Sequence, residues 1–370
     1  MECDPLFIRK ELLQLAPCAH GGRLHEIAEQ KGLNEAGLLD FSVNLNPYLP
    51  MSGREAILKA CDRIAEYPDN RYTEFRASAA RFCGVLPENV VPGNGSSEII
   101  RLFAHAAIAP GDIVAIPAPT FGEYEQQCRL FGGRIRYVRM ADVLKGEFWH
   151  LDGSKAAFFC NPNNPDGRLV KADFVQALAR YCQDHDIALA VDEAFIDLAD
   201  PGQSVARHVE TYDNLLVLRS LTKCFAIPGF RLGFGVACRE AAEALNVIRL
   251  TWNVDSVAAE AGAFYMDEAA SYLSLSREYI KREREWLAGH IEEIPGLRVL
   301  PSSVNYFLVD VSGTGMTSAL FAARMLNQGI VVRDCASFKM LGETFVRLAV
   351  RPREENERLV RALKTVAGSP

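Results

Sequence analysis

Short hydrophobic runs alternate with longer amphipathic segments through the middle of the chain. Four runs are continuous in Val, Ile, Leu, Ala or Phe and predict buried strands: residues 112–119, 155–162, 187–195 and 215–220. Between them, residues 122–133 and 171–186 have the i, i+3, i+4 hydrophobic spacing of amphipathic helices. This alternation predicts an α/β fold in which helices cover both faces of a mostly parallel sheet.

The pattern changes near residue 240. Residues 239–266 and 273–294 each predict one long helix, and alternating stretches at 302–311, 329–335 and 344–350 predict strands. The first 50 residues have the character of loops and turns. The predicted parts are an N-terminal arm over residues 1–50, a large domain over 51–240 and a smaller α+β domain over 241–370.

Composition and charge exclude several classes of protein. The 370 residues are 49% hydrophobic and carry a net charge of −7 without a strongly basic stretch, which argues against nucleic acid as a partner. A local pocket of arginines could still bind a small anionic substrate. No hydrophobic run is long enough to span a membrane, and no secretory signal opens the chain. The ten cysteines include no C-x-x-C pair, which argues against a disulfide framework and a zinc site and predicts reduced thiols in the cytoplasm.

A glycine-rich turn, "PGNGSSEII" (Pro92–Ile100), opens an amphipathic helix. Gly95, Ser96 and Ser97 would present backbone N–H groups and hydroxyls at a helix N-terminus, which is a ready anion site. The alternative is a tight turn with a capping serine.

Two further polar groups follow predicted strands. In "CNPNNPDG" (Cys160–Gly167) the prolines fix a turn, so Asn164 could hold a ligand oxygen, although the stretch is also explained as a structural turn. In "LAVDEAF", Asp192 is costly to bury without a cation. That cation could be an arginine of the chain or a protonated ring nitrogen of a ligand; a helix N-cap is a further alternative for Asp192.

A lysine follows the last of these strands, in "RSLTKCFAIPGFRLGFG" (Arg219–Gly235). Lys223, if desolvated there, would have a lowered pKa and could form a Schiff base with an aldehyde. Ser220, Thr222 and Arg231 could bind a phosphate beside it. The alternative is an ordinary solvated surface lysine. Together, an aldehyde site, a phosphate site, a carboxylate for a ring nitrogen and an amide for a ring hydroxyl describe one cofactor, pyridoxal 5′-phosphate.

Seven motifs, in this order and spacing, resemble those of fold-type I pyridoxal-phosphate enzymes, closest to the histidinol-phosphate aminotransferase branch. They are "YPDNRY", "GNGSSE", "PTFGEYE", "NPNNPDG", "VDEAF", "RSLTKCFAIPGFRLG" and "VRLAV". The resemblance implies a large domain with a mostly parallel seven-stranded sheet, a small C-terminal domain, and an arm that packs with the small domain and the active site.

The resemblance also implies roles for individual residues. Lys223 would be the Schiff-base lysine, Asp192 would pair with the ring nitrogen and Asn164 would bond the ring 3′-oxygen. Phe121 would stack on the ring, and Arg347 would meet the substrate carboxylate. The cofactor phosphate would be held by Gly95, Ser96, Ser97, Ser220, Thr222 and Arg231, and by Tyr67 of the neighbouring subunit in a homodimer.

Three stretches resemble one sub-branch, the threonine-phosphate decarboxylases of cobalamin synthesis. They are "HGG" (20–22) with "DFSVNLNP" (40–47), "SLTKCFAIPGFRLG", and "VRDCASF", which places Arg333 beside Cys335. Phe195 also fits, because the aminotransferases normally carry tyrosine there. The substrate would be L-threonine O-3-phosphate, released as (R)-1-aminopropan-2-ol O-phosphate and CO2. Its phosphate would be bound by Arg333, His20, Gly21, Asn44 and Arg23, since a guanidinium can bond two oxygens at once.

Two residues depart from that sub-branch: Arg23 stands where asparagine is common, and Asp166 replaces the threonine of "NNPTG". The extra cation could favour phosphoserine as substrate, whereas the second change would affect the turn alone. Transamination of histidinol phosphate is the main rival hypothesis for the same fold. A non-catalytic ligand sensor is disfavoured, because the Lys223, Asp192 and Asn164 set is intact and no DNA-binding module is appended.

Overall fold

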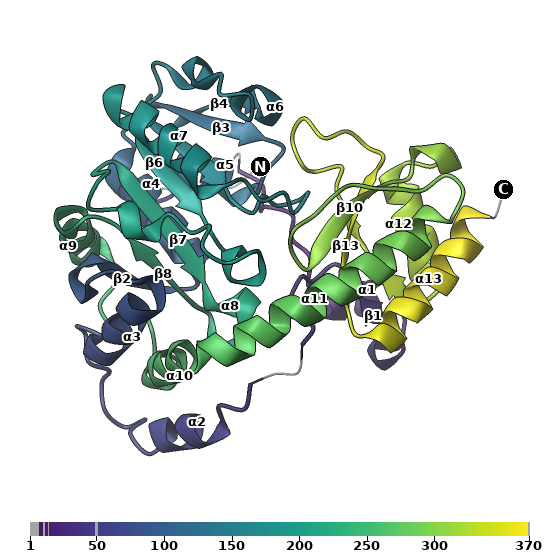
Figure 1. The fold of residues 1–370 in the computed structure, drawn as a ribbon, viewed down its shortest axis with the longest axis horizontal. Coiled ribbons are helices and arrows are strands. Elements are labelled where there is room, and N and C mark those ends of the chain that lie inside the picture. The colour runs from purple at the N-terminus through teal and green to yellow at the C-terminus, as the bar shows by residue number, and fades with distance from the viewer. Residues whose placement is uncertain (1–6, 10–11, 14, 49–50, 369–370) are drawn as a thin grey trace.

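Two β-sheets lie at opposite ends of the computed structural model, which describes residues 7–9, 12–13, 15–48 and 51–368 (Figure 1). The larger sheet has seven strands, and every neighbouring pair is parallel except the two pairs that include β8. In spatial order the strands are β2 (Val90–Asn94), β8 (Leu232–Val236), β7 (Leu215–Ser220), β6 (Ala188–Asp192), β5 (Ala156–Cys160), β3 (Ile113–Ala118) and β4 (Arg134–Arg139). The predicted mostly parallel seven-stranded sheet is confirmed.

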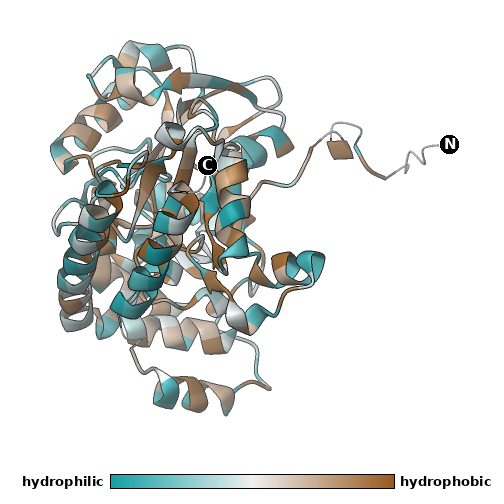
Figure 2. Ribbon diagram, turned by 90° about the vertical axis from the view of Figure 1, so that its right-hand side faces the viewer, coloured by the Kyte–Doolittle hydropathy of each residue, from teal (hydrophilic) through white to brown (hydrophobic). Residues whose placement is uncertain are grey.

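Helices cover both faces of this sheet. Successive strand residues point to opposite faces, so Phe158 and Phe159 of β5 belong to two different hydrophobic clusters. The helices of the Phe158 cluster are α4 (Ser96–Ala107), α5 (Glu123–Leu130) and α9 (Arg239–Ile248). Those of the Phe159 cluster are α3 (Thr73–Cys83), α6 (Met140–Val143), α7 (Ala172–Asp184), α8 (Leu221–Cys224), α10 (Ser256–Asp267) and the first half of α11 (Ala269–Glu292). The outer helices carry both hydrophilic and hydrophobic residues, as helices that cover a sheet must (Figure 2).

The smaller sheet is antiparallel and has its own hydrophobic cluster. Its strands, in spatial order, are β12 (Arg333–Asp334), β13 (Phe345–Ala349), β10 (Tyr306–Asp310) and β9 (Arg298–Val299). The long helix α11 (Ala269–Glu292) runs from the side of the larger sheet toward the smaller one (Figure 1). Helices α12 (Ser318–Asn327) and α13 (Arg353–Ala367) complete this part of the structure.

The N-terminal residues contact both the part that carries the smaller sheet and the part that carries the larger one. Strand β1 (Leu39–Asp40) pairs in parallel with β11 (Ile330–Val331), and the backbone N–H of Asn46 donates to the carbonyl of Lys223 at 3.1 Å. The expectation of loops and turns was wrong for α1 (Leu24–Lys31), which buries only Ala28 and so carries little hydrophobic periodicity. Helix α2 (Arg54–Cys61) follows. The division of the chain into an arm, a large domain and a small domain, with boundaries at residues 50 and 240, stays a prediction.

The segment expected to form one helix over residues 239–266 forms two. Helix α9 ends at Ile248, and α10 begins at Ser256 after Trp252 adopts a left-handed backbone with φ of 54°. The Asp255 carboxylate accepts a hydrogen bond from the backbone N–H of Ala258 and so caps α10. Hydrophobic spacing continues across this break, which is why periodicity alone missed it. The helix predicted over 273–294 is confirmed as part of α11.

No helix within the described residues has the length and hydrophobicity needed to cross a membrane. The nine cysteines of this part of the chain are all free.

Candidate active site

A cavity of about 770 Å³ opens at the carboxyl ends of the parallel strands. This is where open α/β sheets bind ligands, because strand-end loops converge there. Segments after β2, β3, β5, β6 and β7 line it on the side of the larger sheet, while the N-terminal arm, β12 and β13 line it opposite. The predicted site residues that line it are His20, Gly21, Asn44, Gly95, Ser96, Ser97, Phe121, Asn164, Asp192, Ser220, Thr222, Lys223, Arg231, Arg333 and Arg347.

Lys223 lies just after β7, in the short helix α8, and its side chain lines the cavity. Burial lowers its pKa to about 8, and the positive charges of Arg347 and Arg231 act in the same direction. The lysine Nζ lies 5.8 Å from the centre of the Phe195 ring. Near neutral pH much more of this amine is therefore neutral than of an ordinary lysine, as a nucleophilic lysine requires.

Asp192 ends β6 and is buried at the base of the cavity. Its Oδ2 accepts a hydrogen bond from the Tyr124 hydroxyl at 2.6 Å, and its Oδ1 accepts one from the backbone N–H of Ala194 at 2.9 Å. Burial raises the pKa of the carboxyl, and the hydrogen bonds from Tyr124 and Ala194 and the charge of Lys223 oppose this effect only in part. Within the described residues Asp192 forms no ion pair, so this carboxylate suits a protonated ring nitrogen.

The N-terminus of α4 forms the anion-binding end of the cavity. Gly95 precedes the helix with φ of 77°, and a Cβ there would lie 3.0 Å from Nη2 of Arg231. Ser96 and Ser97 occupy the first turn, whose backbone N–H groups have no intrahelical partners. Arg231 forms no ion pair within the described part of the chain and donates only to the carbonyl of Pro228. A guanidinium beside free helix N–H groups is a fitting site for a phosphate.

Arg347, on the opposite wall, bonds across the cavity to Asn164, which follows β5 of the larger sheet. The buried Arg347 donates from Nη1 to Asn164 Oδ1 and from Nη2 to the carbonyl of Ser42. The Nε of Arg347 has no hydrogen-bond partner in the described residues. Burial lowers the pKa of the Arg347 guanidinium. In β12, Arg333 stands directly opposite Arg347 in strand register, so two guanidinium groups line this side.

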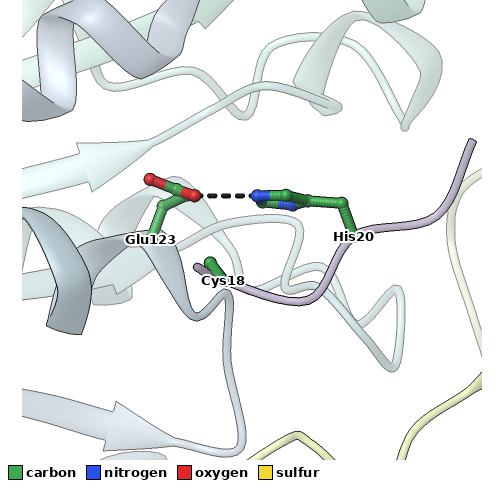
Figure 3. A group of neighbouring side chains, drawn as sticks. All are labelled: Cys18, His20 and Glu123. Carbon is green, nitrogen blue, oxygen red and sulfur yellow. Dashed lines mark hydrogen bonds and ion pairs between the residues drawn. The ribbon is translucent and has the colours of Figure 1, made fainter. Parts of the chain in front are cut away.

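The arm contributes His20, Gly21 and Asn44. The His20 imidazole Nε2 bonds Oε1 of Glu123 at 2.8 Å (Figure 3). A Cβ on Gly21 would lie 2.6 Å from the carbonyl oxygen of Ser42, so close packing requires glycine there. The buried Asn44 side chain lines the cavity, and its Nδ2 has no hydrogen-bond partner in the described residues. Such an orphaned donor is suited to a ligand oxygen.

Arg333 holds the arm in place. It donates from Nη2 to the carbonyl of Ala19 at 2.9 Å and to Ser337 Oγ at 2.9 Å. Arg23 was expected to bind the substrate phosphate together with Arg333. It pairs instead with Glu26 on α1 and does not line the cavity. The ion pair with Glu26 on α1 thus keeps the Arg23 guanidinium outside the cavity.

Tyr67 is absent from its own chain's cavity and is 77% exposed. Its ring stacks on that of Trp252 with centroids 4.2 Å apart. Its contact with a neighbouring subunit stays a prediction.

Asp166 has a local structural role. Its Oδ1 accepts hydrogen bonds from Asn163 Nδ2 at 2.9 Å and from the backbone N–H of Arg168 at 3.3 Å. The carboxylate thereby braces the turn that positions Asn164, as the sequence led us to expect.

Sequence reasoning missed Tyr124 and Glu123. Both belong to "PTFGEYE", from which only Phe121 was selected. Helical spacing gives no signal that links Phe121 to Tyr124, because α5 begins only at Glu123. Their bonds to Asp192 and His20 join segments 68 and 103 residues apart in sequence, and local patterns cannot reveal such pairs.

The cavity fits the predicted cofactor. It places a low-pKa lysine, a buried carboxylate that lacks a cation, an aromatic ring and a phosphate-binding helix end around one space. On this fit Lys223 would hold the aldehyde, Asp192 the ring nitrogen, and Arg231 with the start of α4 the phosphate. Phe121 lines the same cavity and would stack on the ring.

Comparison with known proteins gives a consistent result. The family model described as aminotransferase class I and II matches residues 36–363. A threonine-phosphate decarboxylase of Salmonella typhimurium is 33% identical, covering 94% of this chain and 96% of that protein. A histidinol-phosphate aminotransferase of Methanothermobacter thermautotrophicus is 30% identical, with 96% of each covered. The structure of Sinorhizobium meliloti histidinol-phosphate aminotransferase in complex with pyridoxal-5′-phosphate superimposes with a TM-score of 0.86 over 99% of this chain and 98% of that chain, at 20% identity.

Proposed function

The chain belongs to the aminotransferase class I and II family, and we propose that it decarboxylates L-threonine O-3-phosphate to (R)-1-aminopropan-2-ol O-phosphate and CO2. It is a pyridoxal 5′-phosphate-dependent enzyme of fold type I, as the family and the cavity together establish. The proposed product would serve as a precursor of the cobalamin side chain.

The observation that carries this proposal is the pair of guanidinium groups on the wall that faces the cofactor site. Arg347 lies beside Asn164, and Arg333 lies beside the His20 segment of the arm. Two adjacent cations suit a substrate with two anionic groups, a carboxylate and a phosphate. The unpartnered Nδ2 of Asn44 offers a further donor to the same space.

Each residue then has a defined task. Bound pyridoxal 5′-phosphate supplies an electron sink for the pair left at the substrate Cα. Asp192 would keep the ring nitrogen protonated, and Lys223, once its amine is free, would return a proton to Cα after CO2 leaves. Arg333, His20 and Gly21 would anchor the substrate phosphate at the arm. That anchor would fix the orientation of the α-carboxylate, the group that leaves as CO2.

Phe195 supports the same branch. Its ring is buried, lines the cavity and packs edge-on against Tyr306 with centroids 4.8 Å apart. A phenylalanine cannot donate to the ring 3′-oxygen, so Asn164 alone would serve that atom.

A second candidate is transamination of histidinol phosphate. The similarity to histidinol-phosphate aminotransferases favours it, at 30% identity for the Methanothermobacter protein and 32% for one from Archaeoglobus fulgidus. A third candidate, decarboxylation of O-phosphoserine, rested on Arg23, and the pairing of Arg23 with Glu26 leaves that cation outside the cavity.

One assay separates these candidates. Purified holoenzyme is incubated with L-threonine O-3-phosphate, O-phosphoserine or histidinol phosphate, each with and without 2-oxoglutarate, while CO2 and glutamate are measured. We expect CO2 from phosphothreonine with or without the keto acid, and little from phosphoserine. Glutamate formed from histidinol phosphate, with no CO2 from phosphothreonine, would establish the aminotransferase instead.

We also infer a homodimer in which Tyr67 reaches the cofactor phosphate of the partner. Tyr67 and its stacking partner Trp252 are exposed, and Leu250 beside them is 75% exposed. Size-exclusion chromatography with light scattering measures the oligomeric state. The substitution Tyr67→Phe should weaken retention of the cofactor. A monomer that keeps its cofactor would contradict the inference.

A further inference from the structure

Three side chains with metal-binding atoms converge at the arm side of the cavity. Cys18 and His20 come from the arm, and Glu123 begins α5. One donor atom of each lies within 4.8 Å of the other two. Figure 3 shows the imidazole of His20 facing the Glu123 carboxylate, with Cys18 beside that carboxylate.

We propose that Cys18, His20 and Glu123 form a binding site for a thiophilic divalent cation such as Zn²⁺. Sulfur, imidazole nitrogen and carboxylate oxygen are the three ligand types that zinc takes in proteins, and three protein ligands leave a fourth position open. A thiolate and a carboxylate also balance the charge of a divalent ion. The thiol proton passes to the solvent on binding, and no oxidant or reductant is involved.

The surroundings of Cys18, His20 and Glu123 favour metal binding over a catalytic role for these side chains. Gln127 donates from Nε2 to Oε2 of Glu123 at 3.0 Å, which leaves Oε1 directed at His20. The His20 side chain is 45% exposed, so an ion can reach the site from solvent. Burial raises the pKa of Cys18 to about 11, so the free thiol is a weak nucleophile and a Cys–His catalytic pair is disfavoured.

A second group of similar composition makes a useful contrast. Asp142, Glu147 and His150 also bring their donor atoms within 4.8 Å of one another. Arg139 and Lys145 already pair with the two carboxylate oxygens of Asp142, so cations occupy the positions that a metal would need. No lysine or arginine pairs with Glu123 in the described residues: its partners there are the His20 ring, neutral Gln127 and the Cys18 thiol.

Occupation of the site would inhibit the enzyme, and this part of the inference rests on the proposed function. His20 is one of the residues assigned to the substrate phosphate, and its ring lies 5.9 Å from that of Phe121, which lines the cofactor site. A metal would take the imidazole nitrogen and fix the arm against α5. Substrate binding would be lost while the cofactor stays in place.

The binding test uses holoenzyme and Zn²⁺ alone, in a buffer without amines or chelators. The metal retained after gel filtration gives the stoichiometry, and isothermal titration calorimetry gives the affinity. Zinc X-ray absorption identifies the ligand atoms. We expect one Zn²⁺ per chain with one sulfur neighbour at about 2.3 Å. Cys18→Ser should remove the sulfur neighbour and weaken binding by more than about 100-fold, and Glu123→Gln should weaken it by at least about tenfold.

Matched controls locate the site. Cys61→Ser removes an exposed thiol on α2, and His150→Gln removes a ligand of the contrasting group; both should bind zinc as the unaltered protein does. Unaltered protein that binds no zinc, or Cys18→Ser that binds it equally well, would overturn the proposal. So would loss of binding in His150→Gln alone.

Inhibition is measured separately. Zn²⁺ should slow turnover of the unaltered enzyme and spare Cys18→Ser, with cofactor absorbance unchanged in both. Equal inhibition of the two proteins would overturn the inhibitory role. If the chain proves to transaminate, the binding data are unaffected, because they need no substrate.

Discussion

The two walls of the cavity are built differently. On one wall, Lys223, Asp192 and the start of α4 follow strands of a sheet that is packed on both faces. On the other wall, His20 and Arg333 belong to an arm and a two-residue strand joined by hydrogen bonds between exposed groups. A rigid sheet fixes its strand-end residues closely, whereas an arm depends on a few long-range contacts. We therefore expect changes to the first wall to abolish all chemistry and changes to the second to alter substrate choice.

The largest effect should follow Lys223→Ala. Loss of the amine removes the covalent attachment of the cofactor, so activity should disappear and the cofactor absorbance near neutral pH should be lost. Lys339→Ala is a matched control, because Lys339 lines the same cavity on the arm side. Retained cofactor absorbance in Lys223→Ala would refute the assignment of this wall.

Arg333→Gln should separate the two walls. Loss of a charged partner of a phosphate costs about 3 kcal/mol, so kcat/KM for phosphothreonine should fall about 100-fold while the cofactor absorbance stays unchanged. Arg129→Gln is the control, since Arg129 also lines the cavity but pairs with Glu125. A variant that loses cofactor instead would show that the walls are not independent.

Tyr124→Phe should have a smaller effect on the first wall. Tyr124 donates to Asp192 and so lowers the pKa of that carboxyl, against the larger effect of burial. Without the bond the pKa of Asp192 should rise further, and cofactor affinity should fall roughly tenfold, as measured by dilution of the holoenzyme. Tyr137→Phe, which loses a bond to Glu125 near the arm, should retain its cofactor. Equal affinities of the two variants would mean that Tyr124 only fills space.

The smallest effect concerns pH. The neutral amine of Lys223 is the nucleophile, and its pKa lies at about 8. Uptake of pyridoxal 5′-phosphate by cofactor-free protein should therefore accelerate with rising pH, with its midpoint at about pH 8. In Arg347→Gln the cation that lowers this pKa is gone, and the midpoint should move to higher pH. Stopped-flow absorbance measures the rate; a midpoint unchanged by the substitution would contradict the electrostatic coupling between the walls.

The sequence determined the first wall almost completely. Asp192 and Lys223 stand directly after continuous hydrophobic runs, and a parallel sheet brings the ends of such runs to one edge, so both positions follow from local pattern. Ser96 and Ser97 follow in the same way from a glycine turn that opens a helix. The parallel sheet itself was predictable because its strands β3, β5, β6 and β7 are buried on both faces.

Tertiary structure decided what depends on contacts between distant segments. It joined Tyr124 to Asp192 and Cys18 to Glu123. None of these outcomes has a local signature, because side-chain pairing and capping depend on which groups the completed fold brings within about 3 Å of each other. Hydrophobic periodicity reports which side of an element is buried, and only the assembled chain fixes which polar groups meet across a cavity.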